Sequence, residues 1–499
     1  MRKETLRMER VTYKESGVTQ LDNFSMTIWA GEILGLVPVN HHGLPSLIEL
    51  CRQNLPLHYG YIYYCDKIVN HWRFPDIGRN RISIIRNTSC LAEGLTVADN
   101  VFVLRPGFRK RIMQPKVLYS QLELFLKEIH VEIAADAYVG TLSLFQRFVV
   151  ELLKAVVAGC RLVVLVDIST FVSDAELEKI HGILRFYARK GISFLYIAAH
   201  FEETRQLCDR TSLMMNGQIT KSFFAADRTP DTLFFQCTED FDRKVRGQID
   251  KKLPAAGDTY PAFSASQLCY GEVKDLEFSV GCGECLVLQD LDNDIFPDLL
   301  AVLTGEKKPE KGGIRINGKW LQKRLMRKIA VIQELPLQSM LFGNMSYLDN
   351  LCFTLDHRFT NVWGGKRIRN SLRREYAAVL GEEVFDRRIE ELSERQQYDL
   401  IYTRILLQNP SVVFCVQPFK SAEVSLRIHI WELLEALLDK KIAVVILAVN
   451  LADSLALADR LIRIRKNEEA QEYERADFKN LPVNTPWLYL YREKNKDKF

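Results

Sequence analysis

The sequence lacks three features that would reveal its class at once. There is no strong excess of charge, because 67 basic and 63 acidic residues leave a formal net charge of +4, which argues against nucleic-acid binding. There is no apolar run long enough to cross a bilayer, since the longest ones, 162–166 and 442–449, are typical of buried parallel strands. There is also no apolar signal-peptide core among the first residues. These absences predict a soluble, cytoplasmic protein.

The eleven cysteines follow no disulfide framework. Several of them lie inside apolar segments, which indicates reduced, buried thiols. The pair Cys282 and Cys285 has the CxxC spacing of redox or zinc sites, but no second ligand pair at matching spacing accompanies it. We therefore interpret this pair as a chance spacing in the turn before a strand.

What the sequence does contain is an internal repeat. Leu142-Ser143 recur as Leu392-Ser393, and the apolar segment 160–169 recurs as 410–419 at the same offset of 250 residues. A charged stretch with proline and glycine but no apolar periodicity separates the two copies. We therefore predict two homologous domains, with the bounds 1–240 and 259–499, and a linker at 241–258.

Each half alternates apolar strands with amphipathic helices. In the segment 174–190 the residues Leu177, Ile180 and Leu184 share one helical face, and this helix leads into the apolar strand 192–198. Alternation of this kind predicts α/β layers around a largely parallel sheet.

Residues 36–50, LVPVNHHGLPSLIEL, have the layout of a phosphate-binding loop. An apolar strand is followed by a turn of about nine residues and an apolar helix, the arrangement in which backbone N–H groups and a lysine hold phosphates. Here no lysine lies between the strand and the helix. The loop therefore keeps the shape of a phosphate site without its main cation.

Together with this loop, an ordered set of segments resembles the ATP-binding subunits of ABC transporters. The likeness is to the double-length type that serves bacterial ribose, galactoside and xylose importers. It covers most of the chain, in segments such as GVTQLDNFSMTIWAGEILGLV, EGLTVADNVF, HFEETRQLCDR and LSERQQ. The resemblance implies an α/β fold of two tandem ABC-ATPase-like (P-loop NTPase-type) domains, with mixed sheets flanked by helices and a helical subdomain in each. It also implies ATP and Mg²⁺, held between the phosphate loop of one half and the LSGGQ signature of the other.

The first half departs from the family pattern where phosphate is bound. Leu44 stands at the lysine position and Pro45 at the position of the Mg²⁺-binding hydroxyl. The lysine alone supplies a charged hydrogen bond worth roughly 1.5–3 kcal/mol. Asn40, Gly43 and Ser46 remain as the candidate nucleotide-binding residues, and we interpret them as weak remnants. Other family positions are occupied by Glu15, Pro38, His41, Asn87, Val166, Asp167 and Ala199. His200 lies one residue beyond the switch-histidine position and is expected to point the other way.

The second half departs further from the pattern. Its loop carries Asp290, Ile295, Phe296 and Pro297 at the glycine, lysine and hydroxyl positions, and Val416 and Gln417 replace the acidic pair. Val449 ends the switch strand, and carboxylates at 290, 292 and 294 are expected to repel phosphate. In the signatures, Ser143 and Ser393 persist, but Leu144-Phe145 and Glu394-Arg395 replace the paired glycines. Side chains there obstruct the close approach of backbone to phosphate.

Two groups of residues resemble metal ligands only superficially. His41 and His42, with Asp167, are adjacent on a tight loop, and adjacent histidines rarely reach the same ion. The aspartates at 290, 292 and 294 lack the distal glutamate of a Ca²⁺ loop. We therefore predict no metal site.

The sequence leaves three functional interpretations open. In the first, the chain is a pseudo-ATPase without catalytic residues or a bound cofactor, and it acts as a non-catalytic binding or regulatory subunit with permease-like membrane or signalling proteins. In the second, it is a functional subunit that hydrolyses ATP with Mg²⁺ to drive carbohydrate import. In the third, ADP or another anion binds weakly at the first helix start through Asn40, Gly43 and Ser46.

The partner implied by the resemblance is a permease-like integral membrane protein. Its expected docking surface is a groove beside the middle region of each half, at residues 87–105 in the first half and 333–351 in the second. We expect neither nucleic-acid binding nor direct sugar binding. The implied location is the cytoplasm, with peripheral attachment to the inner face of the cell membrane as the alternative.

Overall fold

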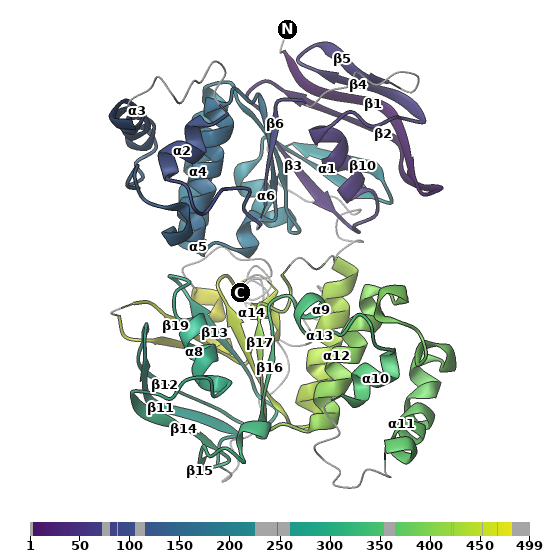
Figure 1. Cartoon of the computed structure of the whole chain (residues 1–499), viewed down its shortest axis with the longest axis vertical. Coiled ribbons are helices and arrows are strands. Elements are labelled where there is room, and N and C mark those ends of the chain that lie inside the picture. The colour runs from purple at the N-terminus through teal and green to yellow at the C-terminus, as the bar shows by residue number, and fades with distance from the viewer. Residues whose placement is uncertain are drawn as a thin grey trace, which may run out of the picture. The chain divides into compact units, whose positions relative to one another are not determined.

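The computed structural model describes most of the chain. The described residues are 3–71, 80–104 without Asn87, 115–224, Gly247, 260–353, and 365–481 without Ser421, Glu423, Ala452 and Asn467. The chain splits into two compact units, Met1–Thr238 and Glu239–Phe499 (Figure 1). The predicted linker, apart from Gly247, lies outside the described residues, and so does Asn87.

The first unit contains two sheets. A four-stranded antiparallel sheet has the order β2-β1-β4-β5, and a six-stranded sheet has the order β10-β9-β3-β8-β7-β6. Within the larger sheet, β3 pairs in parallel with β8 and β9, whereas β10 runs antiparallel to β9. The strands are β1 (Glu4–Glu15), β2 (Val18–Trp29), β3 (Ile33–Pro38), β4 (Tyr59–Tyr64), β5 (Lys67–His71), β6 (Ile82–Ile85), β7 (Leu162–Val166), β8 (Ser193–Ile197), β9 (Arg210–Met215) and β10 (Gln218–Phe224).

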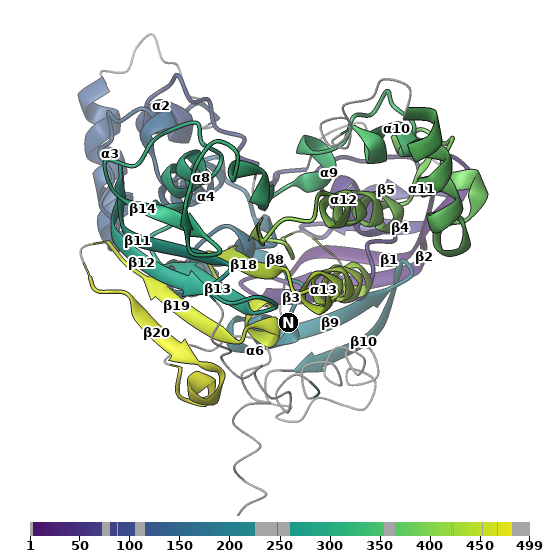
Figure 2. The same cartoon turned by 90° about the horizontal axis from the view of Figure 1, so that it is seen from below.

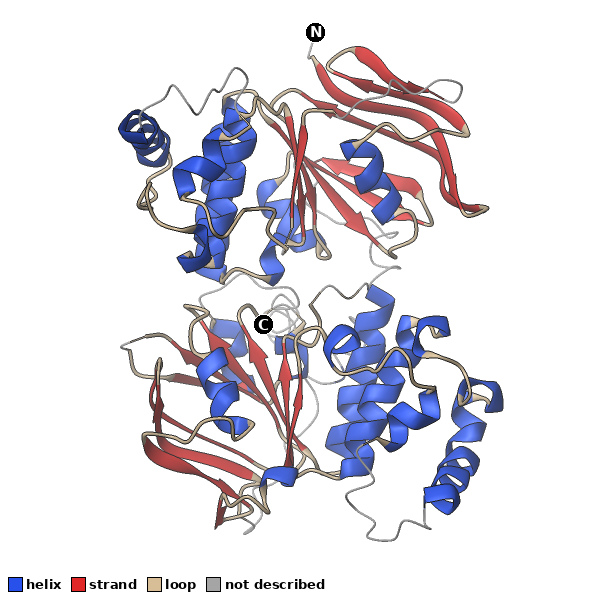
Figure 3. Cartoon of the chain, viewed as in Figure 1, coloured by secondary structure: helices blue, strands red, loops and turns tan. Residues whose placement is uncertain are grey.

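Helices pack on both faces of the six-stranded sheet, as Figure 3 shows by colour. They are α1 (Leu44–Arg52), α2 (Val97–Phe102), α3 (Pro115–Glu128), α4 (Leu144–Val157), α5 (Asp174–Arg189) and α6 (Phe201–Leu207). Capping boxes begin α4 at Ser143 and α5 at Ser173, because each serine exchanges hydrogen bonds with the residue three positions on. The predicted helix at 174–190 is confirmed.

Alternate residues of each parallel strand face opposite cores. Val163 and Leu165 of β7 pack with α4 and α5, whereas Leu162 and Val164 pack with α1 and the antiparallel sheet. A strand buried on both faces needs an unbroken apolar sequence, which is why LVVLV reads as it does. The predicted parallel character of the sheet core is confirmed.

The second unit repeats this plan. Its sheets have the orders β12-β11-β14-β15 and β16-β17-β18-β13-β19-β20. The strands are β11 (Phe263–Tyr270), β12 (Val273–Val280), β13 (Cys285–Asp290), β14 (Lys311–Ile316), β15 (Lys319–Trp320), β16 (Ile329–Ile332), β17 (Val412–Val416), β18 (Ala443–Ala448), β19 (Arg460–Ile464) and β20 (Gln471–Glu474). The helices are α8 (Phe296–Leu303), α9 (Pro336–Ser339), α10 (Tyr347–Cys352), α11 (Gly365–Leu380), α12 (Glu394–Gln408), α13 (Val424–Asp439) and α14 (Ser454–Leu457). Figure 2 shows α12 and α13 nearly end-on and side by side.

No helix among the described residues is both long enough and apolar enough to cross a bilayer.

Candidate functional site

The first candidate loop connects the buried strand β3 to α1. Gly43 caps α1 with a φ of 80°, a left-handed conformation that favours glycine. A Cβ atom at Gly43 would lie 2.2 Å from the carbonyl oxygen of Gln20 and 3.0 Å from the Cα of Gly217. The backbone of two neighbouring turns therefore presses against this glycine, and its role in the structure is close packing.

Asn40 and His42 tie the loop to the same neighbourhood. The Asn40 amide donates to Asn216 Oδ1 at 2.7 Å, and Asn40 Oδ1 accepts from the backbone N–H of Asn216 at 3.2 Å. His42 Nε2 lies 2.8 Å from the carbonyl oxygen of Thr19. Both side chains thus engage groups of the protein itself.

Ser46, the third predicted residue, faces a carboxylate. Its buried hydroxyl donates to Glu15 Oε2 at 3.3 Å. Burial raises the pKa of nearby Tyr13, and the carboxylates of Glu15 and Glu49 raise that pKa further. The helix start therefore sits in a negative environment, although its backbone dipole favours anions. Within the loop, Asn40, Gly43 and Ser46 each contact a different protein group.

The second candidate loop, between β13 and α8, holds an anion of its own. The fully buried carboxylate of Asp290 accepts backbone N–H groups of its own loop through both oxygens. Oδ1 accepts from Asp292 at 3.1 Å and from Asn293 at 3.0 Å, and Oδ2 accepts from Ile295 at 2.7 Å. Burial raises the pKa of Asp290, and the three N–H donors oppose that shift. Backbone donors of this kind are those that a phosphate loop offers to its ligand.

The residues around Asp290 complete the filling of this site. Gln289 is fully buried, donates to the carbonyl of Val449 at 3.2 Å, and accepts from Arg463 Nε at 3.0 Å. Asp292 Oδ2 accepts from the backbone N–H of Lys466 at 2.8 Å. The side chain of Phe296, at the family's lysine position, is buried in the core. The loop is thus packed with its own side chains.

Asp167 and His200, at or next to positions that the resemblance assigns to catalysis, lie near the buried carboxyl of Glu203. Asp167 adopts a left-handed φ of 50°, and its carboxylate raises the pKa of Glu203. Glu203 accepts from Ser169 Oγ at 2.8 Å and from the Tyr196 hydroxyl, and burial is the main cause of its raised pKa. His200 is buried, and its charge lowers the pKa of Glu203.

The equivalent edge of the second unit carries an ion pair. The side chain of Lys420 is buried and pairs with Glu334, which follows the end of β16 by two residues. Gln417 has a left-handed φ of 44°, and its backbone N–H donates to the carbonyl of Leu447. A cation is thus present here, but it is neutralised by a carboxylate of the protein.

Both signature serines cap helices. Ser143 Oγ accepts from the backbone N–H of Gln146 at 3.2 Å, and Ser393 Oγ accepts from that of Gln396 at 3.3 Å. In return, the backbone N–H groups of Ser143 and Ser393 donate to the side-chain Oε1 atoms of Gln146 and Gln396. Both serines therefore begin their helices with the same capping box.

The two cysteines with CxxC spacing lie in different environments. Cys282 is exposed, whereas Cys285 is fully buried in β13. Within the described ranges, no group of three or more His, Cys, Asp or Glu residues is placed to hold a metal ion.

Comparisons with known proteins agree with this architecture. No family model matches the chain. It is 23% identical to the ribose import ATP-binding protein RbsA of Clostridium tetani, with 95% of each chain covered. It is 24% identical to the xylose import ATP-binding protein XylG of Shigella flexneri, with 92% of each covered. A solved model of ribosome-bound archaeal Pelota and ABCE1 matches 94% of this chain and 79% of that one, with a TM-score of 0.61 and 13% identity. The fold is that of two tandem ABC-ATPase-like domains.

The fold predicted from the resemblance is therefore confirmed, as is the similarity to the ATP-binding proteins of sugar importers along nearly the whole chain. In these ABC-ATPase-like domains, sequence reasoning missed two features of the loops. It interpreted Asp290 only as a charge that repels phosphate, and it did not foresee the contact between Glu15 and Ser46. For Asp290 a signal existed, because aspartate often accepts N–H groups a few residues further on.

Proposed function

We propose that this chain is a pseudo-ATPase, a relative of the ATP-binding component of sugar importers that acts as a non-catalytic binding or regulatory subunit of a permease-like membrane protein. The observation that carries the proposal is the carboxylate of Asp290, which accepts from Asp292, Asn293 and Ile295 the N–H groups of its own phosphate-type loop. To bind this loop, a triphosphate would have to displace the Asp290 carboxylate from these N–H groups, and that carboxylate is part of the chain itself.

The first loop supports the same proposal by a different route. Leu44 and Pro45 supply neither a cation nor a hydroxyl, and Ser46 already donates to the carboxylate of Glu15. Removing a single preorganised donor can reduce a rate by roughly 10² to 10³. Several such groups are absent here at once, so hydrolysis has no residue set to act through.

A second candidate function is ATP hydrolysis that drives carbohydrate import. It is favoured by the names of the relatives, which are ribose and xylose import ATP-binding proteins. This function requires that ATP and Mg²⁺ bind in at least one loop. It also requires that the contacts of Asp290 or of Glu15 rearrange when they bind.

Nucleotide titration separates the two functions. We expect no heat in calorimetry and no thermal shift with ATP, ADP or Mg²⁺-ATP at about 5 mM, a concentration that would stabilise a millimolar binder by about 1 kcal/mol. An importer ATPase with measurable ATP hydrolysis, titrated under the same conditions, serves as the positive control. Phosphate release above the no-protein rate, or a saturable shift with ATP, would contradict the proposal.

The proposed docking surface contains exposed apolar side chains. In the described part of 87–105, Leu95, Val103 and Leu104 are exposed, Leu104 by 60%. In the second unit, Phe342 is exposed, and its ring centroid lies 4.4 Å from that of exposed Phe353, two residues beyond the range 333–351. Apolar and aromatic side chains exposed together are typical of protein interfaces.

We expect Leu104→Glu and Phe342→Glu each to reduce binding of the full chain to inverted membrane vesicles from its own cells by about tenfold, as for central interface residues. Vesicle sedimentation with the labelled chain measures this. Leu124→Glu is the matched control, because Leu124 is exposed by 65% and lies on α3, outside the proposed surface. If the unmodified chain does not sediment, or if the control loses as much binding, the docking surface is wrong.

A further inference from the structure

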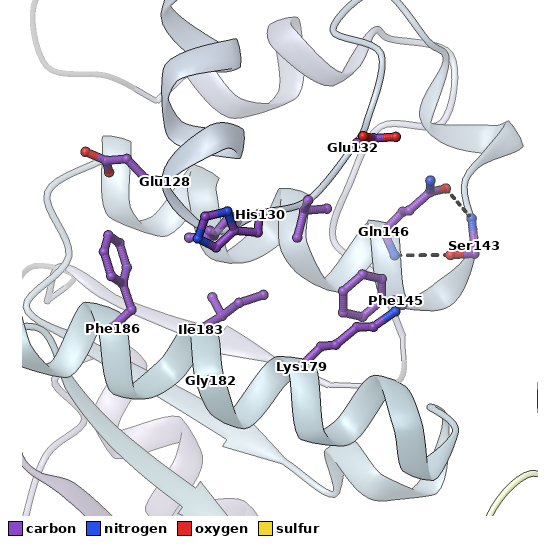
Figure 4. Close-up of a pocket in the computed structure, with 12 residues that line it drawn as sticks. Glu128, His130, Glu132, Ser143, Phe145, Gln146, Lys179, Gly182, Ile183 and Phe186 are labelled. Carbon is purple, nitrogen blue, oxygen red and sulfur yellow. Dashed lines mark hydrogen bonds between the residues drawn. The ribbon is translucent and has the colours of Figure 1, made fainter.

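The first unit contains a pocket that the proposed function does not use. It has a volume of about 720 Å³, within the range of small-molecule sites. It lies between the loop after α3, the start of α4 and one face of α5 (Figure 4). The side chains that matter for its chemistry are those of His130, Phe145, Lys179, Ile183 and Phe186.

The walls of the pocket are aromatic and aliphatic. Figure 4 shows Phe186 at one end, Phe145 at the other, and His130 above Ile183 between them. Gly182 lies on the same face of α5, and a Cβ atom there would meet no heavy atom within 4 Å. A glycine inside a helix lowers helix stability, and here its effect on the surface is to leave the floor of the pocket open.

The charge on the pocket rim is cationic at one point. Lys179 is exposed, and its Nζ lies 5.9 Å from the Phe145 ring centroid. Glu128 pairs with Lys190 at 2.7 Å, which neutralises that carboxylate. The rim residue Glu132 is exposed, and no ion pair joins it to Lys179 in the described structure. Lys179 is therefore the cation available to a ligand beside the aromatic walls.

The second unit carries ion pairs at the equivalent place. Residues 250 positions later are Arg395 for Phe145, His429 for Lys179 and Glu432 for Gly182. There, Glu432 lies 4.0 Å from Arg395 and 3.7 Å from His429, and His429 Nε2 lies 2.7 Å from Asp399. Identical positions in two copies of one fold thus carry an open apolar pocket in one and a charged network in the other. The apolar side chains around this pocket are therefore a feature of the first unit that the second unit does not repeat.

We propose that this pocket binds a small aromatic carboxylate. Its ring lies between Phe145 and Phe186 over Ile183 and Gly182, and its carboxylate pairs with the ammonium group of Lys179. An apolar ring fits the aromatic and aliphatic walls of the pocket. A single carboxylate matches the charge of Lys179, for which no ion pair is found in the described structure.

The test uses 2-naphthoate as the probe and the full chain, with calorimetry as the readout. We expect saturable binding. Gly182→Leu fills the floor and should weaken binding at least about tenfold, while its melting temperature stays equal or rises because leucine favours helix more than glycine does. Lys179→Met should weaken binding of 2-naphthoate about tenfold but change binding of the uncharged 2-naphthalenemethanol less than about twofold.

The matched control is Glu178→Leu, an exposed residue of α5 beside the pocket residues that does not line the pocket. It should bind 2-naphthoate as the unmodified chain does. The site assignment fails if 2-naphthoate does not bind, or if Gly182→Leu binds it unchanged. The charge assignment fails if Lys179→Met weakens the acid and the alcohol equally.

Discussion

Replacing Asp290 with glycine is expected to lower the free energy of unfolding of the second unit by about 3 kcal/mol. The carboxylate accepts three backbone N–H groups, a buried one from Ile295 and two partly buried ones from Asp292 and Asn293. A buried donor left without an acceptor costs about 1–3 kcal/mol, and a partly buried one costs less because water can reach it. Part of this cost is recovered, because a buried charge is also removed. Denaturant unfolding, followed separately for each unit's transition, measures the change.

Asp294→Gly is the control for this prediction. Asp294 belongs to the same loop but is exposed, so its replacement should change stability by less than about 0.5 kcal/mol. In the Asp290→Gly variant, the three N–H groups that Asp290 accepts in the parent are free, so this anion nest should bind an external anion. Sulfate at ten times its dissociation constant would restore about 1.4 kcal/mol. If sulfate stabilises the control as strongly as the variant, the N–H groups of this loop do not form an anion nest.

The second large effect concerns acid stability and the histidine at 181. His181 is buried on α5 with its ring against that of Tyr196, and burial, aided by the charge of Arg185, lowers its pKa to about 4 from 6.5. Below pH 6.5 the unfolded chain therefore binds a proton that the folded chain refuses. Stability is lost as the pH falls from 6.5 toward 4, by about 3 kcal/mol for this group alone.

His181→Phe should remove this part of the acid sensitivity, because phenylalanine fits against Tyr196 and does not titrate. The measurement is the difference in unfolding free energy between variant and parent at pH 7 and at pH 4.5. A difference is needed because buried Glu203, whose pKa is raised, acts in the opposite sense and favours the fold as the pH falls. Parallel profiles of parent and His181→Phe would contradict the prediction.

The repeat, the strands and the helix faces could be predicted from the sequence because they depend on local patterns. The unbroken apolar runs at 162–166 and 442–449 allow little else than buried strands. The positions that the resemblance assigns to phosphate binding could be located in both halves, because the spacing from strand to helix is the same in each. For example, Pro45 and Pro297 fall at the same point near the start of α1 and α8.

The contacts that the residues at these positions make in the structure could not be predicted in the same way. Asn40 pairs with Asn216, which is 176 residues away, and Ser46 donates to Glu15 across 31 residues. Such contacts depend on how distant turns pack, and no local pattern encodes them. The pocket at Gly182 is a similar case, since a glycine within a helical pattern does not indicate which other segment faces it in the fold.

Asp290 shows why like residues in one motif need separate treatment. The sequence presents the carboxylates at 290, 292 and 294 as equivalent, and their shared expectation is repulsion of phosphate. In the structure, Asp290 is buried and holds its own loop, Asp292 accepts the N–H of Lys466, and Asp294 is exposed. The difference arises because only Asp290 ends the strand β13 and is carried into the core with it.

The bonding of Asp290 also bears on the history that this protein can have. If the proposed function holds, the aspartate arose in an ancestor whose loop still bound a nucleotide. Any single reversal now passes through a chain whose loop has neither its own acceptor nor a triphosphate, and which is less stable for it. Selection for a stable fold alone would then disfavour each single step by which the loop could regain nucleotide binding.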